Sequence, residues 1–171
     1  GLKTALFAMV GGDASGERIM GVLKREKISP QLMSVEKKLR TNASVVLNYQ
    51  GERTILVYHE DFRYRLAKIP PVKWIYLTTM GPRYPGVYAT VAKHVAKAKT
   101  KLAFNPGSMQ LRSGVQKLKP ILRQTNILFL NKEEAELLTG LTEDIKTLLK
   151  GMTKLGPRIA VLTDGSKGSF V

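Results

Sequence analysis

Short apolar runs alternate along the chain with stretches in which apolar residues recur every three or four positions. The runs are short and apolar enough for buried strands and lie at Thr4–Val10, Lys73–Thr78, Lys101–Phe104, Ile127–Leu130 and Arg158–Leu162. Helical patterns fall between them, at Ser15–Lys27, Gly86–Lys99, Leu111–Gln124 and around Ile145–Met152. This alternation predicts an α/β fold, in which helices cover a parallel sheet and connect its strands through right-handed crossovers.

One segment, residues 31–60, breaks this alternation because its pattern is typical of strands without helices. The stretch ASVVLNYQGERTILVYHE predicts a hairpin that turns at Gln50 and Gly51. Such a small antiparallel sheet would project from the α/β body as a lid. With 171 residues and 43% hydrophobic content, the chain can bury one core. We therefore expect one domain over residues 1–171, with residues 31–60 as an inserted β lid.

The arms of the predicted hairpin are apolar at alternate positions, namely Val45, Leu47, Ile55 and Val57. Alternate residues of a strand share a face, so these four predict an apolar face that needs covering. An uncovered face of this kind favours self-association of the lid. Trp74, in the second apolar run, is expected to lie in the core.

Charge is unevenly distributed along the chain. There are 28 Lys and Arg against 13 Asp and Glu, a net charge of +15, and no acidic residue occurs from Phe62 to Lys132. Fourteen Lys and Arg fall in that interval. A basic block of this kind attracts nucleotide phosphates, sugar phosphates or nucleic acid, and it does not choose among them. The alternative is a solvated basic surface without a partner.

Two absences narrow the class of protein. The chain contains no Cys, which excludes disulfides and thiolate metal sites and fits a cytoplasmic protein. No apolar run approaches the roughly 18 residues that would span a membrane. We therefore expect no membrane partner.

Polar residues follow three of the apolar runs, at the positions where ligands bind in α/β sheets. GGDASG follows the first run, NKEE follows ILFL, and TDGSKG follows IAVL. A Gly-rich turn such as TDGSKG can offer backbone N–H groups to phosphate, and Thr163 can add a hydroxyl. The alternative reading of each motif alone is structural: the glycines make tight turns, the acids of NKEE favour a helix N-terminus, and Asp13 caps the helix that begins near Ser15.

The order of the motifs narrows these alternatives. GGDASG, TNASVVLNYQGERTI, LAFNPGS, ILFLNKEEAELLTG and VLTDGSKGSF follow one another along the chain. In this order they resemble the ribokinase-like, PfkB-type family of carbohydrate and nucleoside kinases, from about Ala5 to Val171. The resemblance implies a three-layer fold, in which a parallel sheet has helices on both faces and carries a small antiparallel β lid. It also implies transfer of the γ-phosphate of ATP to a sugar or nucleoside hydroxyl.

The most specific part of the resemblance is Asn131-x-x-Glu134, which is similar to the family's N-x-x-E motif. It implies that Asn131 and Glu134 help to organise Mg²⁺, through its waters, around the phosphates of ATP. Hard oxygen ligands suit Mg²⁺, which usually keeps several waters. Thr163 and Gly165 resemble the strand-end T-x-G that contacts the nucleotide in this family.

The lid of these kinases covers the sugar and often forms a dimer contact, so the resemblance also implies a homodimer through this lid. Asn42 and Ser44 occupy the stretch from which side chains reach the substrate. The alternative is that both are ordinary polar residues on a sheet exposed on two sides, because the register of the strands cannot be read from one sequence.

Two parts of the family pattern are missing from the 171 residues. One is a further first strand with a sugar-binding Asp and a Gly-Gly pair, and the other is the D-T-x-G-A-G-D loop whose last Asp is the catalytic base. Gly11 and Gly12 match the family's later G-x-D-x-x-G segment, because Asp13 and Gly16 follow them. We therefore expect a truncated kinase that contains no catalytic residue and is inactive alone. The alternative is a non-catalytic basic module that binds nucleic acid weakly or assembles with a partner subunit.

Overall fold

The computed structural model describes residues 2–50 and 52–171, and contacts along the chain divide it into two compact units. The first unit is Gly1–Tyr64 and the second is Arg65–Val171. Residues 31–60 lie in the first unit, whereas Asn131 and Thr163 lie in the second.

The first unit contains a parallel strand pair joined by a helix. Its elements are β1 (Ala5–Gly11), α1 (Ala14–Arg25), β2 (Ser29–Glu36), β3 (Ala43–Tyr49) and β4 (Glu52–Tyr58). Strands β1 and β2 pair in parallel, with Val10 opposite Val35. The chain therefore makes a strand, helix and parallel strand. The strand and the helix were predicted, whereas the parallel pairing of β2 with β1 was not. The predicted lid range overlaps β2, which pairs with β1 and is not part of the hairpin.

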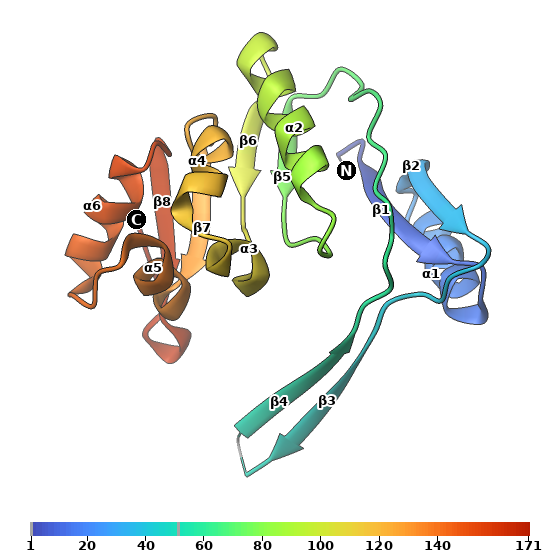
Figure 1. The fold of residues 1–171 in the computed structure, drawn as a ribbon, viewed down its shortest axis with the longest axis horizontal. Coiled ribbons are helices and arrows are strands. Elements are labelled where there is room, and N and C mark those ends of the chain that lie inside the picture. Colours follow the sequence, from blue (N-terminus) through green and yellow to red (C-terminus); the bar gives the residue numbers. More distant parts are fainter. Residues whose placement is uncertain (1, 51) are drawn as a thin grey trace. The chain divides into compact units, whose positions relative to one another are not determined.

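Strands β3 and β4 form the predicted antiparallel hairpin (Figure 1). Gln50 begins the turn with φ of +49°, and Gly51, the other predicted turn residue, lies outside the described residues. The predicted apolar face is wrong in detail, because Val45 pairs with Leu56 while Ile55 pairs with Val46. Directly paired residues share a face, so each face of the hairpin carries its own apolar residues.

The second unit is built on a sheet in the order β5-β6-β7-β8-β9. Its strands are β5 (Trp74–Leu77), β6 (Lys101–Phe104), β7 (Ile127–Asn131), β8 (Ile159–Thr163) and β9 (Ser169–Phe170). Strands β5 to β8 pair in parallel, and β9 is antiparallel to β8. The arrowheads of the parallel strands therefore point to one common edge, the carboxyl edge of the sheet (Figure 1).

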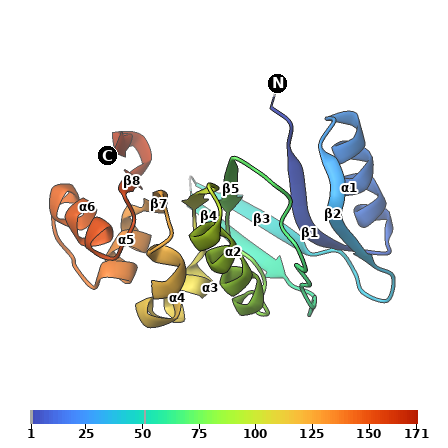
Figure 2. The ribbon, with the colours of Figure 1, turned by 90° about the horizontal axis from the view of Figure 1, so that it is seen from above.

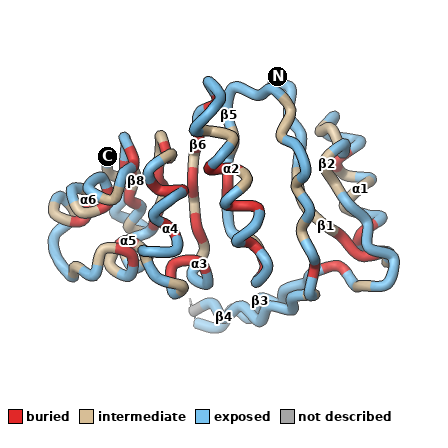
Figure 3. Tube along the Cα trace, turned by 45° about the horizontal axis from the view of Figure 1, so that its top comes forward, coloured by how far each residue is buried: buried red, intermediate tan, exposed pale blue. Residues whose placement is uncertain are grey.

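Helices cover one face of this sheet (Figure 2). They are α2 (Pro85–Lys97), α3 (Ser108–Arg112), α4 (Val115–Leu122), α5 (Lys132–Thr139) and α6 (Ile145–Lys154), with a short 3₁₀ turn η1 (Gly165–Lys167) before β9. Alternate strand residues on the covered face are fully buried, including Leu102, Leu128 and Leu162 (Figure 3). Among the described residues, no helix is long and apolar enough to cross a membrane.

The opposite face of the sheet is not covered by residues 65–171. Trp74 is 47% exposed and Tyr76 is 62% exposed, so the prediction that Trp74 lies in the core is wrong. The reason is geometric: side chains alternate between the faces of a strand, and Trp74 lies on the face away from α2–α6. Residues 65–171 thus supply one helix layer of the expected three-layer arrangement.

The predicted single helix over Leu111–Gln124 is two helices, α3 and α4. Gly114 separates them with φ of +94°. Side-chain-bearing residues rarely adopt this left-handed region, and a right-handed helix cannot continue through it. The hydrophobic period alone did not reveal the break, because buried Leu111, Leu118 and Leu122 keep a helical spacing across it.

Candidate functional site

The ends of β7 and β8 bring the two most specific sequence motifs together. Asn131 is the last residue of β7, Thr163 is the last residue of β8, and the two are register partners. Both are exposed at the carboxyl edge, where α5 and the turn after β8 begin (Figure 1). The two motifs are therefore neighbours although about thirty residues separate them in sequence.

Asn131 and Glu134 hold each other in a reciprocal capping box at the start of α5. The Asn131 side-chain oxygen accepts a hydrogen bond from the Glu134 backbone N–H at 2.8 Å. The Glu134 carboxylate oxygen Oε2 accepts one from the Asn131 backbone N–H at 3.0 Å. Such a box satisfies backbone donors that a helix N-terminus leaves free. It also fixes both side chains, and Oε1 of Glu134 accepts no hydrogen bond from the described residues.

The turn after β8 begins next to Thr163, the register partner of Asn131, and presents backbone N–H groups. The Asp164 N–H donates to the Gly168 carbonyl at 2.9 Å, and the Lys167 ammonium pairs with Asp164 at 3.1 Å. Gly165 has φ of +52°, and among the described residues neither its N–H nor that of Ser166 has an acceptor. Successive free N–H groups in a tight turn form a concave site that suits an anion.

The donor set at this edge fits one kind of divalent metal site. Within residues 2–50 and 52–171, no group of three or more His, Cys, Asp or Glu side chains could hold a metal. A dedicated protein cage is therefore not built here. A half-buried Glu134 with one carboxylate oxygen free does fit Mg²⁺, which is usually held by one or two carboxylates together with substrate phosphates and waters.

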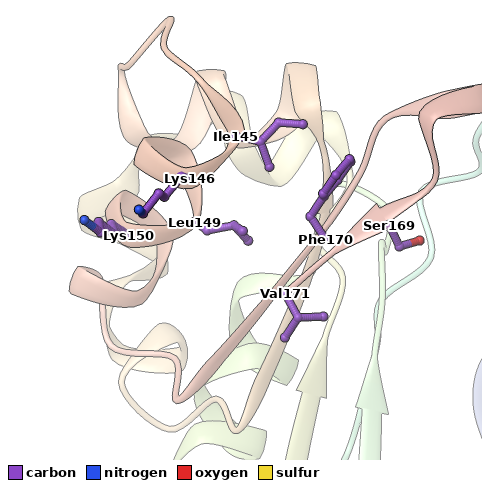
Figure 4. Close-up of a pocket in the computed structure, with 7 residues that line it drawn as sticks. All are labelled: Ile145, Lys146, Leu149, Lys150, Ser169, Phe170 and Val171. Carbon is purple, nitrogen blue, oxygen red and sulfur yellow. The ribbon is translucent and has the colours of Figure 1, made fainter.

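A pocket of about 660 Å³ lies next to this edge, between α6 and β9. Its apolar wall is made by Ile145, Leu149 and Phe170, whose side chains approach one another in Figure 4. Ser169, which also lines it, is the register partner of Thr163. None of the predicted nucleotide or metal residues lines the pocket, so it is adjacent to the candidate site but distinct from it.

The predicted substrate residues Asn42 and Ser44 lie in the first unit, where they are exposed. Asn42 has a structural contact that the sequence did not suggest, because its side-chain oxygen accepts a hydrogen bond from the Glu60 backbone N–H at 2.8 Å. The Glu60 carboxylate in turn accepts from the Tyr58 hydroxyl at 2.8 Å and from the Arg40 backbone N–H at 3.0 Å. These bonds close the base of the hairpin, and the bonds from the Tyr58 hydroxyl and the Arg40 N–H lower the pKa of Glu60.

Asp13 caps α1 as predicted, but sequence reasoning missed its second partner, Thr41. Asp13 accepts a hydrogen bond from the Gly16 N–H at 2.9 Å and two from Thr41, at 2.6 Å from the hydroxyl and 2.9 Å from the N–H. The Thr41 hydroxyl also accepts from the buried Gly11 N–H at 3.0 Å. Mainly because of the Thr41 hydroxyl, the pKa of Asp13 falls to about 2.

Gln110 is a second polar residue that sequence reasoning missed. It is fully buried, and its amide joins the loops that follow β5 and β6. The side-chain oxygen accepts from the Thr79 hydroxyl at 3.0 Å and from the Gly107 N–H at 3.2 Å, and the side-chain NH₂ donates to the Met80 carbonyl at 2.7 Å. Gln110 therefore fixes two loops at the carboxyl edge. A glutamine within an amphipathic stretch carries no sequence signal for this role.

Comparison with known proteins identifies the family of this chain. All of the chain, residues 1–171, matches the pfkB family of carbohydrate kinases. The chain belongs to the PfkB family.

Among PfkB-type relatives, an uncharacterised sugar kinase of Archaeoglobus fulgidus is 23% identical over 177 residues, which is 100% of this chain and 70% of that protein. Two solved structures are similar in fold. The fructokinase of Vibrio cholerae, in a fructose, ADP and calcium ion bound form, has a TM-score of 0.74 and 23% identity. The ribokinase of Arabidopsis thaliana, complexed with ribose and ATP, has a TM-score of 0.74 and 22% identity.

The two solved kinases are longer than this PfkB-family chain. The match covers 98% of this chain in both cases, but only 59% of the fructokinase chain and 57% of the ribokinase chain. The comparisons establish the family and the fold of this chain. Because the chain spans less than two thirds of the two solved kinases, the activity of a complete kinase is a proposal.

Proposed function

We propose that this chain provides the nucleotide-binding and Mg²⁺-binding part of a PfkB-type kinase that transfers the γ-phosphate of ATP to a sugar or nucleoside hydroxyl. The observation that carries the proposal is the adjacency of the Asn131–Glu134 capping box and the turn from Thr163 to Gly168. In this proposal the Thr163 hydroxyl and the free N–H groups of Gly165 and Ser166 contact the phosphates of ATP. The register of β7 with β8 supports it, because both motifs end at one edge.

Glu134 requires a cation in this arrangement, because a carboxylate beside phosphates repels them unless a positive ion lies between. Bound Mg²⁺ would neutralise charge on the phosphates as the γ-phosphate leaves. The role of Asn131 is then positional. It holds α5, and with it the free oxygen of Glu134, in one orientation toward the phosphates, which favours transfer by pre-organisation.

We further propose that the hairpin β3–β4 acts as a lid and as a contact between two copies of the chain. The exposed apolar residues on both faces support this proposal; they include Val45 at 58% and Leu56 at 57% exposure on one face. Asn42 and Ser44 would face the sugar or nucleoside. The Asn42 side-chain NH₂ lies 3.4 Å from His59 Nδ1, which can take one of its two hydrogens and leaves the other for such a contact.

The 171 residues alone are proposed to transfer phosphate poorly. A general base must reach the attacking hydroxyl. In this proposal both oxygens of Glu134 are occupied, Oε2 by the capping bond and Oε1 by the Mg²⁺ site, and Asp164 is paired with Lys167.

Calorimetric titration of ATP into the chain, with Mg²⁺ and again with EDTA, tests the proposal. Glu134→Gln is the decisive variant, because glutamine at this position still closes a capping box while the negative charge is removed. Glu133→Gln is the matched control: Glu133 is exposed in the same helical turn and takes no part in the box. We expect Mg²⁺-dependent affinity to fall at least about tenfold in Glu134→Gln, equivalent to about 1.4 kcal/mol, and to change little in Glu133→Gln.

Equal affinity in the presence and absence of Mg²⁺, or equal loss in both variants, would remove the metal role of Glu134. Absence of any ATP binding by the unaltered chain would remove the proposed function.

A further inference from the structure

Seven of the eighteen basic residues of the second unit lie at the amino edge of its sheet, where the parallel strands begin. Lys73 immediately precedes β5, Lys101 is the first residue of β6, and Arg158 immediately precedes β8. Lys99 lies in the loop that leads into β6. All four are exposed. Because the four strands are parallel, their starts lie on the same edge, opposite the arrowheads in Figure 1.

Helix ends add further cations to this edge. Lys97 is the last residue of α2, Lys154 is the last residue of α6, and Arg123 directly follows α4. Each of these helices leads into the next parallel strand, so it ends where that strand begins. All three side chains belong to exposed residues. We refer to these seven residues at strand starts and helix ends as the basic edge.

The acids of the second unit lie elsewhere. They are within α5, immediately before α6, or immediately after β8, on the side where the strands end: Glu133, Glu134, Glu136, Glu143, Asp144 and Asp164. Within the described residues, no member of the basic edge forms an ion pair. The positive charge of this edge is therefore neither neutralised by a neighbour nor interrupted by an acid.

Favourable interaction with helix dipoles accounts for only part of the pattern. A cation at a helix C-terminus is stabilised by the partial negative charge there, which explains Lys97, Arg123 and Lys154. It does not explain Lys73, Lys101 and Arg158, which stand at strand starts. Of these three, Lys101 also lies over the Trp74 ring, with its Nζ 5.4 Å from the ring centroid. The cations at the strand starts have no helix C-terminus to stabilise them, which points to an anion outside the chain.

Hydrogen bonds connect the strand starts and loops that carry these cations. The Lys101 N–H donates to the Lys73 carbonyl at 2.9 Å, the Thr100 hydroxyl donates to the Val72 carbonyl at 2.8 Å, and the Asn126 N–H donates to the Leu102 carbonyl at 2.8 Å. Neighbouring strands lie about 4.8 Å apart, so the distance from the start of β5 to the start of β8 is roughly 15 Å. Several phosphates of a nucleic-acid strand fit along such a length.

We propose that the basic edge binds the phosphate backbone of nucleic acid, without preference for sequence. Lys predominates in it, and Lys contacts to phosphate position a protein without reading bases. A membrane surface fits less well, because binding there needs an amphipathic helix that lies along the surface with an apolar face. Here α2, α4 and α6 end at the edge and run away from it. The basic edge is also separate from the candidate nucleotide site, which lies at the opposite edge.

Binding of a labelled DNA duplex of arbitrary sequence, measured by fluorescence anisotropy over a series of salt concentrations, tests this proposal. The test variant combines Lys97→Gln, Lys99→Gln and Arg123→Gln. The control combines Lys3→Gln, Lys24→Gln and Lys38→Gln, which removes the same charge from exposed residues of the first unit. Circular dichroism of all three proteins verifies that each is folded.

Each phosphate contact is worth roughly fivefold in affinity at about 0.15 M salt. We expect the test variant to lose roughly 100-fold and the slope of log affinity against log salt to decrease by about 2 to 3. The control should lose less than about tenfold in affinity for the duplex. No binding to DNA, equal losses in the two variants, or tighter binding to anionic lipid vesicles than to DNA would each overturn the proposal.

Discussion

Asn131 and Thr163 lie opposite each other as register partners at the ends of the parallel strands β7 and β8. This pairing joins a helix cap to a glycine turn at one edge of the sheet. Substitutions at Asn131 can distinguish its contribution to the stability of α5 from its proposed contribution to ligand binding.

The first prediction concerns the capping role of Asn131. Asn131→Ala removes the oxygen that accepts the Glu134 N–H, so the free energy of unfolding should fall by about 0.5–2 kcal/mol. Asn131→Ser keeps a capping oxygen and should stay within about 0.5 kcal/mol of the unaltered chain. Urea unfolding monitored by circular dichroism measures both. Equal destabilisation by Ala and Ser would show that a capping oxygen at position 131 does not contribute to the free energy of unfolding.

The second prediction concerns pH. The pKa of Asp13 is about 2 in the folded chain against an ordinary value of 3.8. Because the folded value is the lower one, Asp13 stabilises the fold above about pH 4, and this stabilisation is lost as the pH falls toward 2. Thr41→Val removes the largest cause of the shift, so the pKa of Asp13, followed by carboxyl NMR, should rise toward 3.8. Thr41→Ser retains the hydroxyl and should keep the low value; an unchanged pKa in Thr41→Val would contradict the assignment.

The third prediction concerns Gln110. Gln110→Met fills a similar volume but leaves the Thr79 hydroxyl, the Gly107 N–H and the Met80 carbonyl without their partner. Unfolding should become easier by about 2–4 kcal/mol, because these groups remain away from water. Gln116→Met, at an exposed position of α4, is the matched control and should change stability by less than about 0.5 kcal/mol. A similar small effect of both substitutions in urea unfolding would show that the loops do not depend on Gln110.

The fourth prediction concerns the hairpin. Val45→Thr with Leu56→Thr alters one face, and Val46→Thr with Ile55→Thr alters the other. Threonine suits a strand because it is β-branched, and it offers less apolar surface to a second copy than Val, Leu or Ile. Sedimentation velocity over a range of concentrations should show that the unaltered chain self-associates, and that at least one pair weakens association roughly tenfold. A chain that stays monomeric throughout would exclude the hairpin contact.

The fifth prediction concerns activity. Residues 1–171 should turn over ATP at least about 10⁴-fold more slowly, with any of a panel of sugars and nucleosides, than the longer fructokinase of Vibrio cholerae does with fructose. In the proposed arrangement neither Glu134 nor Asp164 serves as a general base, which alone is worth about 10² to 10⁴ in rate, and donors that stabilise the transferred group are worth a further ~10² to 10³. A coupled ADP assay measures both proteins. Appreciable turnover by residues 1–171 that disappears in Glu134→Gln would contradict this prediction.

The strands of the second unit were predictable because each is a short apolar run between helical stretches. Lys101–Phe104 has the predicted limits, and Ile127–Leu130 extends by one residue to Asn131. Features that depend on one dihedral angle or on distant neighbours were not predictable. Gly114 breaks a helix through its positive φ, and Trp74 is exposed because residues 65–171 cover only the opposite face.

The motifs of the candidate site were predictable from the sequence, but the contacts between residues far apart in the chain were not. NKEE indicated both a helix cap and a metal ligand, and the structure contains the cap. The contact of Asp13 with Thr41 joins residues 28 positions apart and leaves no local pattern in the sequence. The faces of the hairpin depend on the register across a turn, which places Val45 opposite Leu56.

The separation of charge in the second unit makes it an electric dipole of its own, with its positive end at Lys73, Lys99 and Arg123. An anion approaching from solution exerts a torque on such a body before any side chain touches it. The unit would rotate its positive end toward a long polyanion, which shortens the angular search that usually limits association rates. This steering depends on ionic strength, because at about 0.15 M salt it acts only within roughly 8 Å.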